Sequence, residues 1–412
     1  MSLPTRIIAC GVLAGVLLGA QLAAAQTPAP QPATTLADAV RAAWRRSVHA
    51  TEVAGQQRRA QAERTAASAP WAEPPSVELD YRTDRLQTDA GSRETELGVA
   101  IPLWLPGQRA ARRASAEAEE SAANAAQAAG ELQAAALVRE AAWGLTRQQA
   151  EVDLAAQQVQ VLDALASDVE RRVAAGDLAR VDALAARAEL LAATAGLSQA
   201  RQALHAAVIQ WSALTGYASA PEDLQAEQAP ADATLGDAHP ALRAARLGIE
   251  LGRKRLDAVQ ASSRSAPEFV ARLRQDRSAR GEPAANSIGV GLRIPLGTDD
   301  RNAPLQAAAL NELAAAQATE QQLKVQLQAE VDQARAAALA AEQQLAHESE
   351  RSKLMRERAS LIERSFRAGE TPLPELLRAL SDAARAEADL HRQSAALGLA
   401  RARLQQALGI LP

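Results

Sequence analysis

Residues 286–296 read NSIGVGLRIPL, and residues 95–103 read TELGVAIPL. In both stretches apolar side chains alternate with small, polar or charged ones, and both stretches end in Ile-Pro-Leu. Successive side chains of a β-strand point to opposite faces, so this period of two is typical of a strand with one apolar face. The two stretches therefore predict two related strands in distant parts of the chain.

The two Ile-Pro-Leu segments lie 193 residues apart, and the same offset recurs elsewhere. It relates Ala175-Gly176-Asp177 to Ala368-Gly369-Glu370, and Gly216 to Gly409. A constant offset at several positions indicates two copies of one structural unit. We expect the copies at residues 35–216 and 238–409, with a linker at 217–237 and a short tail at 410–412.

Each copy is predicted to begin with a helix, to continue through two strands and to end in two helices. The first helices are expected at 36–68 and 240–263, and the long ones at 108–173 and 304–366. At a rise of about 1.5 Å per residue, each long helix would extend roughly 100 Å. Gly176 and Gly369 then mark the turns into the returning helices, because glycine readily ends a helix.

The long helices carry apolar side chains spaced alternately three and four residues apart, which is the spacing of a coiled-coil seam. The first copy has Val152, Ala155, Val159, Leu162, Ala166, Val169 and Val173. The second copy has Leu327, Val331, Ala334, Ala338, Ala341 and Leu345. The returning helix of the first copy has Val181, Leu184, Ala188, Leu191 and Ala195. We expect these seams to pack the arms as antiparallel hairpins.

Two further strands are predicted around residues 77–82 and 269–274, which gives four strands in two hairpins. Charged side chains alternate with apolar ones, so each strand fits either a half-buried sheet of a soluble protein or a sheet between lipid and water. Four strands alone leave open edges, which hydrocarbon does not tolerate. Because outer-membrane barrels have at least about 8 strands, two or three copies of the chain would have to share one barrel.

Residues 1–25 combine Arg6, an apolar stretch and Ala23-Ala24-Ala25, which is the pattern of a cleaved secretory signal peptide. Residues 26–34 would then form an N-terminal extension. Lipid attachment at Cys10 is the alternative, although the apolar run before this cysteine is short. Cys10 is the only cysteine, so cleavage after Ala25 would leave the mature chain without a disulfide.

The sequence predicts no catalytic, cofactor-binding or metal site, and therefore no enzyme. The five histidines are scattered without the spacing of metal ligands. Asp299-Asp300-Arg301-Asn302 could supply oxygen ligands to a cation, but a turn before the next helix explains it better. A net charge of −4 argues against a nucleic-acid partner, and no later run of about 20 uncharged apolar residues predicts a membrane helix.

In this order, these features resemble the TolC-like outer-membrane efflux family over nearly the whole mature length. Thr35-Leu36-Ala37-Asp38-Ala39-Val40 and Asp237-Ala238-His239-Pro240-Ala241-Leu242 resemble the opening motifs of the family's two repeats. Ile101-Pro102-Leu103-Trp104 and Ile294-Pro295-Leu296 resemble its exits from the barrel. The resemblance implies a mainly α fold with membrane β: duplicated coiled-coil hairpins form a periplasmic tunnel, and four strands per chain join a trimeric 12-stranded barrel.

The resemblance also implies a homotrimer in the outer membrane of a Gram-negative bacterium, in contact with outer-membrane lipid. Its partners would be a periplasmic adaptor protein and an inner-membrane pump of the RND type. The periplasmic tips, which would dock the adaptor, are Gly176, Asp177, Gly369 and Glu370. Asp182 and Glu375, six residues beyond each tip glycine, would line the aperture, where rings of carboxylates attract cations. The alternative is that both acids only stabilise the first turn of a helix.

Ile294-Pro295-Leu296 followed by Asp300-Arg301-Asn302 resembles the CzcC-like heavy-metal branch of the family. We therefore expect a passive export duct for metal cations or small toxic compounds. Two alternatives stay open, namely a type I protein-secretion duct and a periplasmic coiled-coil adaptor or scaffold. A scaffold would be expected to carry a compact β-rich region between its arms, whereas the strands here flank the helices in matched pairs.

Overall fold

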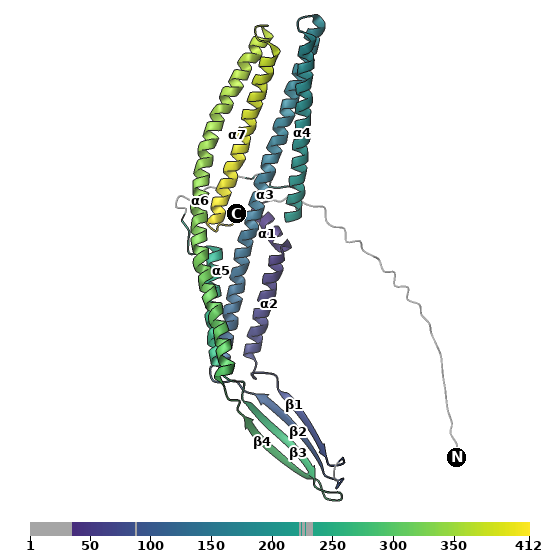
Figure 1. The fold of residues 1–412 in the computed structure, drawn as a ribbon, viewed down its shortest axis with the longest axis vertical. Coiled ribbons are helices and arrows are strands. Elements are labelled where there is room, and N and C mark those ends of the chain that lie inside the picture. The colour runs from purple at the N-terminus through teal and green to yellow at the C-terminus, as the bar shows by residue number, and fades with distance from the viewer. Residues whose placement is uncertain (1–34, 87–88, 222–223, 225–226, 228–233) are drawn as a thin grey trace, which may run out of the picture.

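The computed structural model describes residues 35–86, 89–221, 224, 227 and 234–412. Figure 1 shows an elongated molecule, in which a tall layer of helices stands on one end of a four-stranded sheet. The predicted signal peptide at 1–25, the extension at 26–34 and Cys10 lie outside the described residues. In chain order the elements are α1 (Leu36–Arg46), α2 (Val48–Ser68), β1 (Ser76–Thr83), β2 (Arg93–Pro102), α3 (Gln108–Ala175), α4 (Arg180–Thr215), α5 (Pro240–Ala261), β3 (Glu268–Arg277), β4 (Ala285–Arg293), α6 (Asp299–Arg367) and α7 (Leu373–Ala407).

The same element order occurs twice, as α1/α2-β1-β2-α3-α4 and as α5-β3-β4-α6-α7. This confirms the predicted internally duplicated, mainly helical fold. The first helix of the first copy differs from the prediction, because it is divided at Ser47. The Ser47 hydroxyl accepts a hydrogen bond from the Ala50 amide at 3.0 Å, so this serine starts a new helix instead of continuing the old one.

The long helix α6 begins at Asp299, five residues before the predicted start at Pro304. Asp299 and Asp300 place negative charge in its first turn, where the helix dipole favours it. Asn302 also ties this turn to the end of α5, because its side-chain amide donates to the Ser263 carbonyl at 2.8 Å. The predicted turn at Asp299-Asp300-Arg301-Asn302 is therefore wrong, since these residues already belong to the helix.

The sheet is antiparallel, with the strand order β1-β2-β3-β4. The middle pair, β2 and β3, comes from different copies, so the sheet joins the two repeats directly. In register, Val77 lies opposite Val99, and Leu97 lies opposite Leu273. Leu273 in turn lies opposite Ile288 of β4. Apolar residues of all four strands thus share one face, as the alternation predicted.

The helices pack mainly through small side chains. A cluster around the buried Trp44, Val138 and Trp211 joins α1, α3 and α4 near the middle of the molecule. In the second copy, Ala338 and Ala341 of α6 pack against α7. The predicted seam of α6 is correct, because its members are buried or half-buried. The predicted seam of α3 is buried at Leu162, Ala166 and Val169 and half-buried at its remaining positions.

The predicted packing seam of α4 is wrong. Val181, Leu184 and Leu191 are exposed, and α4 instead turns Ala186 towards α3. A helix with apolar side chains on two faces can use only one of them against its partner. Here the face used within the molecule is the one that carries Ala186, Leu197 and Trp211, which are buried.

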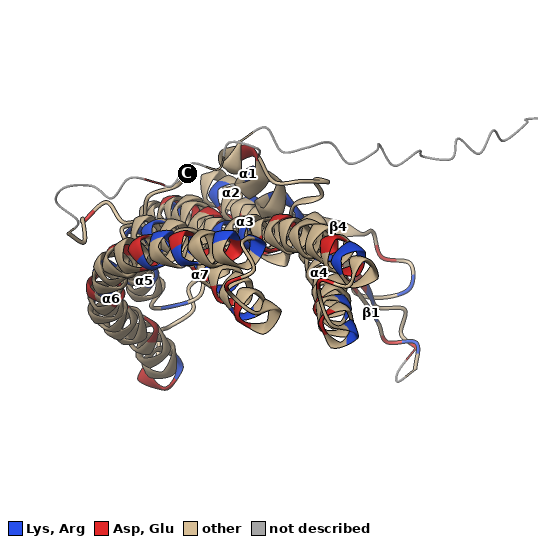
Figure 2. Cartoon of the chain, turned by 90° about the horizontal axis from the view of Figure 1, so that it is seen from above, with Lys and Arg blue, Asp and Glu red and all other residues tan. Residues whose placement is uncertain are grey.

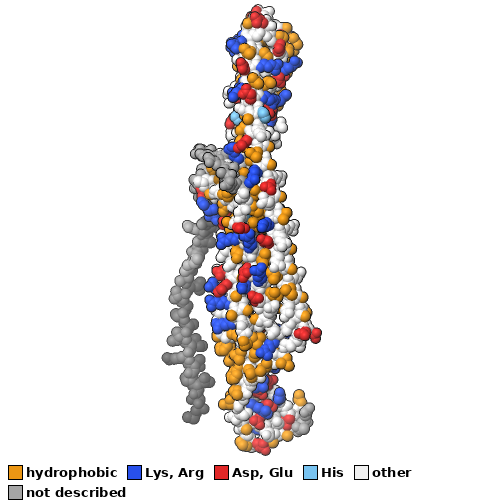
Figure 3. All heavy atoms as spheres, turned by 90° about the vertical axis from the view of Figure 1, so that its left-hand side faces the viewer, with side chains coloured by type: hydrophobic (Ala, Val, Ile, Leu, Met, Phe, Trp, Pro, Cys, Tyr) orange, Lys and Arg blue, Asp and Glu red, His pale blue; other side chains and the backbone are white. Residues whose placement is uncertain are grey.

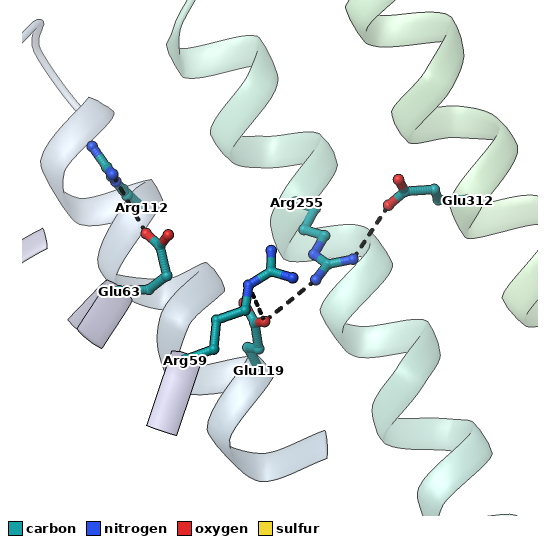
Figure 4. Close-up of polar contacts among 6 residues, drawn as sticks. All are labelled: Arg59, Glu63, Arg112, Glu119, Arg255 and Glu312. Carbon is teal, nitrogen blue, oxygen red and sulfur yellow. Dashed lines mark hydrogen bonds and ion pairs between the residues drawn. The ribbon is translucent and has the colours of Figure 1, made fainter. Parts of the chain in front are cut away.

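Ion pairs link the lower parts of the helices across both copies (Figure 4). Glu119 of α3 lies 3.4 Å from Arg59 of α2 and 3.6 Å from Arg255 of α5. Arg255 also lies 3.4 Å from Glu312 of α6. Farther up, Arg351 of α6 binds Asp389 of α7 at 2.9 Å, and this hydrogen bond lowers the pKa of Asp389. Charged groups therefore link five helices, α2, α3, α5, α6 and α7, to their neighbours.

Arg139 of α3 is the largest charged side chain in the interior, with 1% of its surface exposed. Its guanidinium donates to both carboxylate oxygens of Glu227 in the linker, at 2.8 and 2.7 Å. It also donates to the Gln406 side chain at 2.7 Å and to the Ile410 carbonyl at 2.9 Å. One buried arginine thus attaches both the linker and the C-terminal end to the helical layer.

Glu227→Gln should lower the free energy of unfolding by about 3 kcal/mol, because it leaves the Arg139 charge buried without a counter-ion. Asp168→Asn is the matched control, since it removes an exposed pair with Arg171 and should change stability little. Unfolding of the detergent-solubilised protein with denaturant measures both. Equal stabilities of the two variants would contradict the assigned role of Arg139.

Candidate functional site

The sheet presents one continuous apolar face. From β1 to β4 its members are Val77, Leu79, Tyr81, Leu97, Val99, Ile101, Phe269, Ala271, Leu273, Ile288, Val290 and Leu292. These side chains are not packed beneath the helices, since Leu79 is 72% and Ile288 82% exposed. A half-buried sheet of a soluble protein would cover this face with its own chain, and no described part of the chain does so. An apolar surface of this extent requires another environment.

The opposite face of the same sheet is charged. Its acidic residues are Glu78, Asp80, Glu94, Glu96, Glu268 and Asp276, and its basic residues are Arg82, Arg272, Arg274 and Arg293. Cross-strand ion pairs join Arg272 to Glu96 at 3.1 Å and Arg274 to Glu94 at 3.0 Å. Acidic side chains outnumber basic ones, so this face carries a net negative charge that attracts cations.

Both edges of the sheet are open. Within the described residues, β1 pairs only with β2, and β4 pairs only with β3. Their outer backbone N–H and C=O groups therefore need either water or another strand. Because β1 and β4 run in opposite directions, the β4 edge of one copy can pair antiparallel with the β1 edge of another.

At the far end of the molecule the two hairpin turns adopt the same conformation. Gly176 and Gly369 have φ angles of 85° and 80°. Residues with a Cβ atom rarely adopt such backbone angles. The Asp177 amide donates to the Arg172 carbonyl at 2.9 Å, and the Glu370 amide donates to the Ser365 carbonyl at 3.0 Å. Both long helices thus end in the same glycine-dependent motif, and all four predicted tip residues lie on the exposed turns.

Asp182 lies in the first turn of α4, and its carboxylate accepts a hydrogen bond from the Ala179 amide at 3.2 Å. This contact matches the alternative interpretation, in which the acid stabilises a helix N-terminus. Glu375 lies in the first turn of α7 and is exposed, with no side-chain hydrogen bond or ion pair among the described residues. Of the two candidate acids, Glu375 is therefore the one whose carboxylate is available to attract ions.

Sequence reasoning did not identify the apolar cluster behind the tips. Val169 of α3, Phe366 of α6 and Leu376 of α7 are buried together there, so the two hairpins contact each other. The Arg172 guanidinium lies 5.0 Å from the centre of the Phe366 ring, a cation–π distance. The second tip also contains a hydroxyl pair, Thr371 and Ser365, at 2.6 Å. The sequence offered one signal for this cluster, because Phe366 is one of only two phenylalanines and lies three residues before the tip glycine Gly369.

The described residues contain no group of three or more histidine, cysteine, aspartate or glutamate side chains arranged to hold a metal ion. Among the helices in the described part of the chain, none combines the length and apolar character needed to cross a bilayer. Three surface features stand out in the described part of the chain, namely an apolar sheet face, a charged sheet face and an exposed carboxylate near the hairpin tips.

The sequence matches the outer membrane efflux protein family over residues 42–217 and 235–410, which are the two copies in turn. It is 32% identical over 226 residues to the cobalt-zinc-cadmium resistance protein CzcC of Cupriavidus metallidurans. That alignment covers 52% of this chain and 53% of CzcC, so the chain spans about half the length of this curated relative.

Two solved structures share the fold at low sequence identity. The outer membrane protein VceC of Vibrio cholerae is 17% identical with a TM-score of 0.72, and the match covers 91% of this chain and 96% of VceC. CusC is 15% identical with a TM-score of 0.74, and the match covers 91% of this chain and 92% of CusC. Nearly the whole described chain, helices and strands together, thus follows one known architecture.

Proposed function

The chain belongs to the outer membrane efflux protein family, and on that premise we propose that it forms the outer-membrane duct of a tripartite efflux system. The family and the fold are those of channel proteins rather than of enzymes. The observation that carries the proposal is the sheet, in which one face is apolar except near the hairpin end at Arg93 and Arg277, the other face is charged, and both edges are open among the described residues.

Three copies would close these edges into a barrel of about 12 strands, since each copy supplies four. The apolar face then meets lipid, and the charged face lines water. Each long helix of 68 or 69 residues extends the passage from the membrane by about 100 Å. The signal peptide predicted at residues 1–25 agrees with export to this location.

The hairpin tips would face the periplasm and dock an adaptor protein through Gly176, Asp177, Gly369 and Glu370. Their exposed backbone turns support this role, because they are the outermost points of the molecule at that end (Figure 1). Transport would draw its energy from an inner-membrane pump of the RND type. We assign the aperture to Glu375, because its carboxylate is exposed and makes no hydrogen bond or ion pair among the described residues. Asp182 would contribute less to the charge at the aperture, because its carboxylate already accepts a backbone hydrogen bond.

The cargo we propose is divalent transition-metal cations. Two observations support it. The curated relative is a cobalt-zinc-cadmium resistance protein, and the charged face of the sheet carries more acidic than basic residues. Cations would pass along such a wall more readily than anions, because negative rings and walls lower the energy of positive charge.

Deleting the gene should sensitise the host to zinc, cobalt and cadmium, and the wild-type gene should restore growth. Leu79→Arg should fail to restore it, because an arginine on the lipid face costs about 2–4 kcal/mol. Asp80→Arg is the matched control, because the adjacent Asp80 side chain points to the charged face, and this variant should still reach the membrane. Metal tolerance without the gene, together with new sensitivity to organic toxins, would contradict the proposed cargo.

Glu375→Gln should reduce the cation selectivity of single channels in planar bilayers, because three carboxylates would be lost from one narrow opening. Asp182→Asn should change selectivity less, since that carboxylate already accepts a backbone hydrogen bond. Glu52→Gln on α2, far from the tips, controls for a general loss of charge. Unchanged conductance and selectivity of Glu375→Gln would remove this residue from the aperture.

A further inference from the structure

Two arginines lie on the apolar face of the sheet, where the strands end in the hairpin turns. Arg93 of β2 and Arg277 of β3 are cross-strand partners, and both side chains are exposed. They share the face of Leu97 and Leu273, because residues an even number of positions apart along a strand point to the same side. Two positive charges therefore stand side by side at one end of a surface whose other strand residues are uncharged.

Neither arginine has a counter-ion. The other arginines of the four strands each pair with a carboxylate: Arg82 and Arg274 with Glu94, Arg272 with Glu96, and Arg293 with Glu268. The side chains of Arg93 and Arg277 make no hydrogen bond or ion pair among the described residues. Figure 2 shows basic and acidic residues intermixed along the helices as well. Like charges that face each other across two strands destabilise a sheet, so this pair requires an anion from outside the chain.

The pair also marks one boundary of the apolar rows. Tyr81 lies one row nearer the helices on the same face and is 61% exposed. Aromatic side chains with a polar tip gather where hydrocarbon meets water. At the other boundary Trp71 is exposed, and the Ala72 amide donates to the Pro102 carbonyl at 3.2 Å. The apolar rows thus run between two aromatic residues, and the arginine pair lies just beyond one of them.

The length of the strands agrees with this boundary. From Pro102 to Arg93, β2 extends roughly 30 Å at about 3.4 Å per residue. Strands of outer-membrane barrels tilt by about 40°, which reduces this length to a height of roughly 23 Å, close to their apolar band of about 25 Å. In the proposed barrel the arginines therefore lie at the level of the lipid headgroups on the side away from the helices. Figure 3 shows charged side chains beside hydrophobic ones at this lower end of the molecule.

We propose that Arg93 and Arg277 bind a phosphate group on a lipid headgroup of the outer leaflet. The proposal rests on the proposed function and deepens it, because it names the class of lipid that the barrel wall selects. Each guanidinium presents parallel N–H donors that suit a phosphate, and a phosphate between two of them offsets their repulsion. The apolar rows beside the pair hold the acyl chains. A phosphorylated lipid thus uses both parts of the surface, whereas a free phosphate uses only one.

Lipid retention by the detergent-solubilised protein tests this site, with diphosphoryl lipid A as the probe and phosphatidylcholine as the reference. Native mass spectrometry counts the lipids on each particle, and the wild-type protein should retain one lipid A per copy. Arg93→Gln with Arg277→Gln should weaken this retention about tenfold, because charge-assisted hydrogen bonds to phosphate are lost. Retention of phosphatidylcholine should be the same in both proteins, since its headgroup carries no net charge.

Arg82→Gln with Arg274→Gln is the matched control. It removes the same charge from the same half of the sheet, but these arginines lie on the opposite face and pair with Glu94. This variant should retain lipid A as the wild type does. Excess inorganic phosphate should not release the lipid, because the acyl chains keep it on the apolar rows.

Equal retention of lipid A by the wild type and by Arg93→Gln with Arg277→Gln, in particles that the same spectra show to be trimeric, would overturn this inference and leave the proposed duct intact. Release of the lipid by inorganic phosphate would overturn it too, as would an equal loss in the Arg82→Gln with Arg274→Gln control. A single chain that stays dissolved without detergent would instead remove the proposed function itself.

Discussion

Backbone N–H and C=O groups cannot remain unpaired in hydrocarbon, and the rest of this structure depends on that constraint. The sheet has four strands, one largely apolar face, and two edges that are open among the described residues. A single copy therefore cannot be placed in a membrane. In the proposed duct, sister copies would complete the cylinder, the charged face of the sheet would line an aqueous passage, and the helices that continue from the strands would form a tube of the same symmetry.

The helical layer has several separate buried clusters rather than one compact core. Alanine-rich faces bring neighbouring helices close, ion pairs such as Glu119 with Arg59 and Arg255 fix their lateral order, and Arg139 attaches the linker and the C-terminal end. Apolar surface remains at both lateral sides of the layer. In an isolated copy this surface is exposed to water, whereas the proposed assembly of copies would bury it.

Much of the fold could be predicted from local patterns. The alternation in NSIGVGLRIPL predicted the strand and its apolar face, and the constant offset that relates Gly176 to Gly369 predicted the duplication. Both patterns can be found without knowing which segments meet in space. The α4 seam was misassigned, since spacing alone does not say whether a stripe faces its own hairpin or another copy. The pairing of Arg139 with Glu227 and the contact of Arg172 with Phe366 could not be predicted, because each joins segments brought together only by the tertiary fold.

Counting copies in a lipid environment tests the central claim most directly. Native mass spectrometry of the protein released from lipid nanodiscs measures the number of chains in each particle without labels or mutations. The account predicts three chains in every particle, because three open sheets of four strands complete one cylinder. A protein that stays dissolved in water as a single chain without detergent, with its apolar sheet face bare, would contradict it.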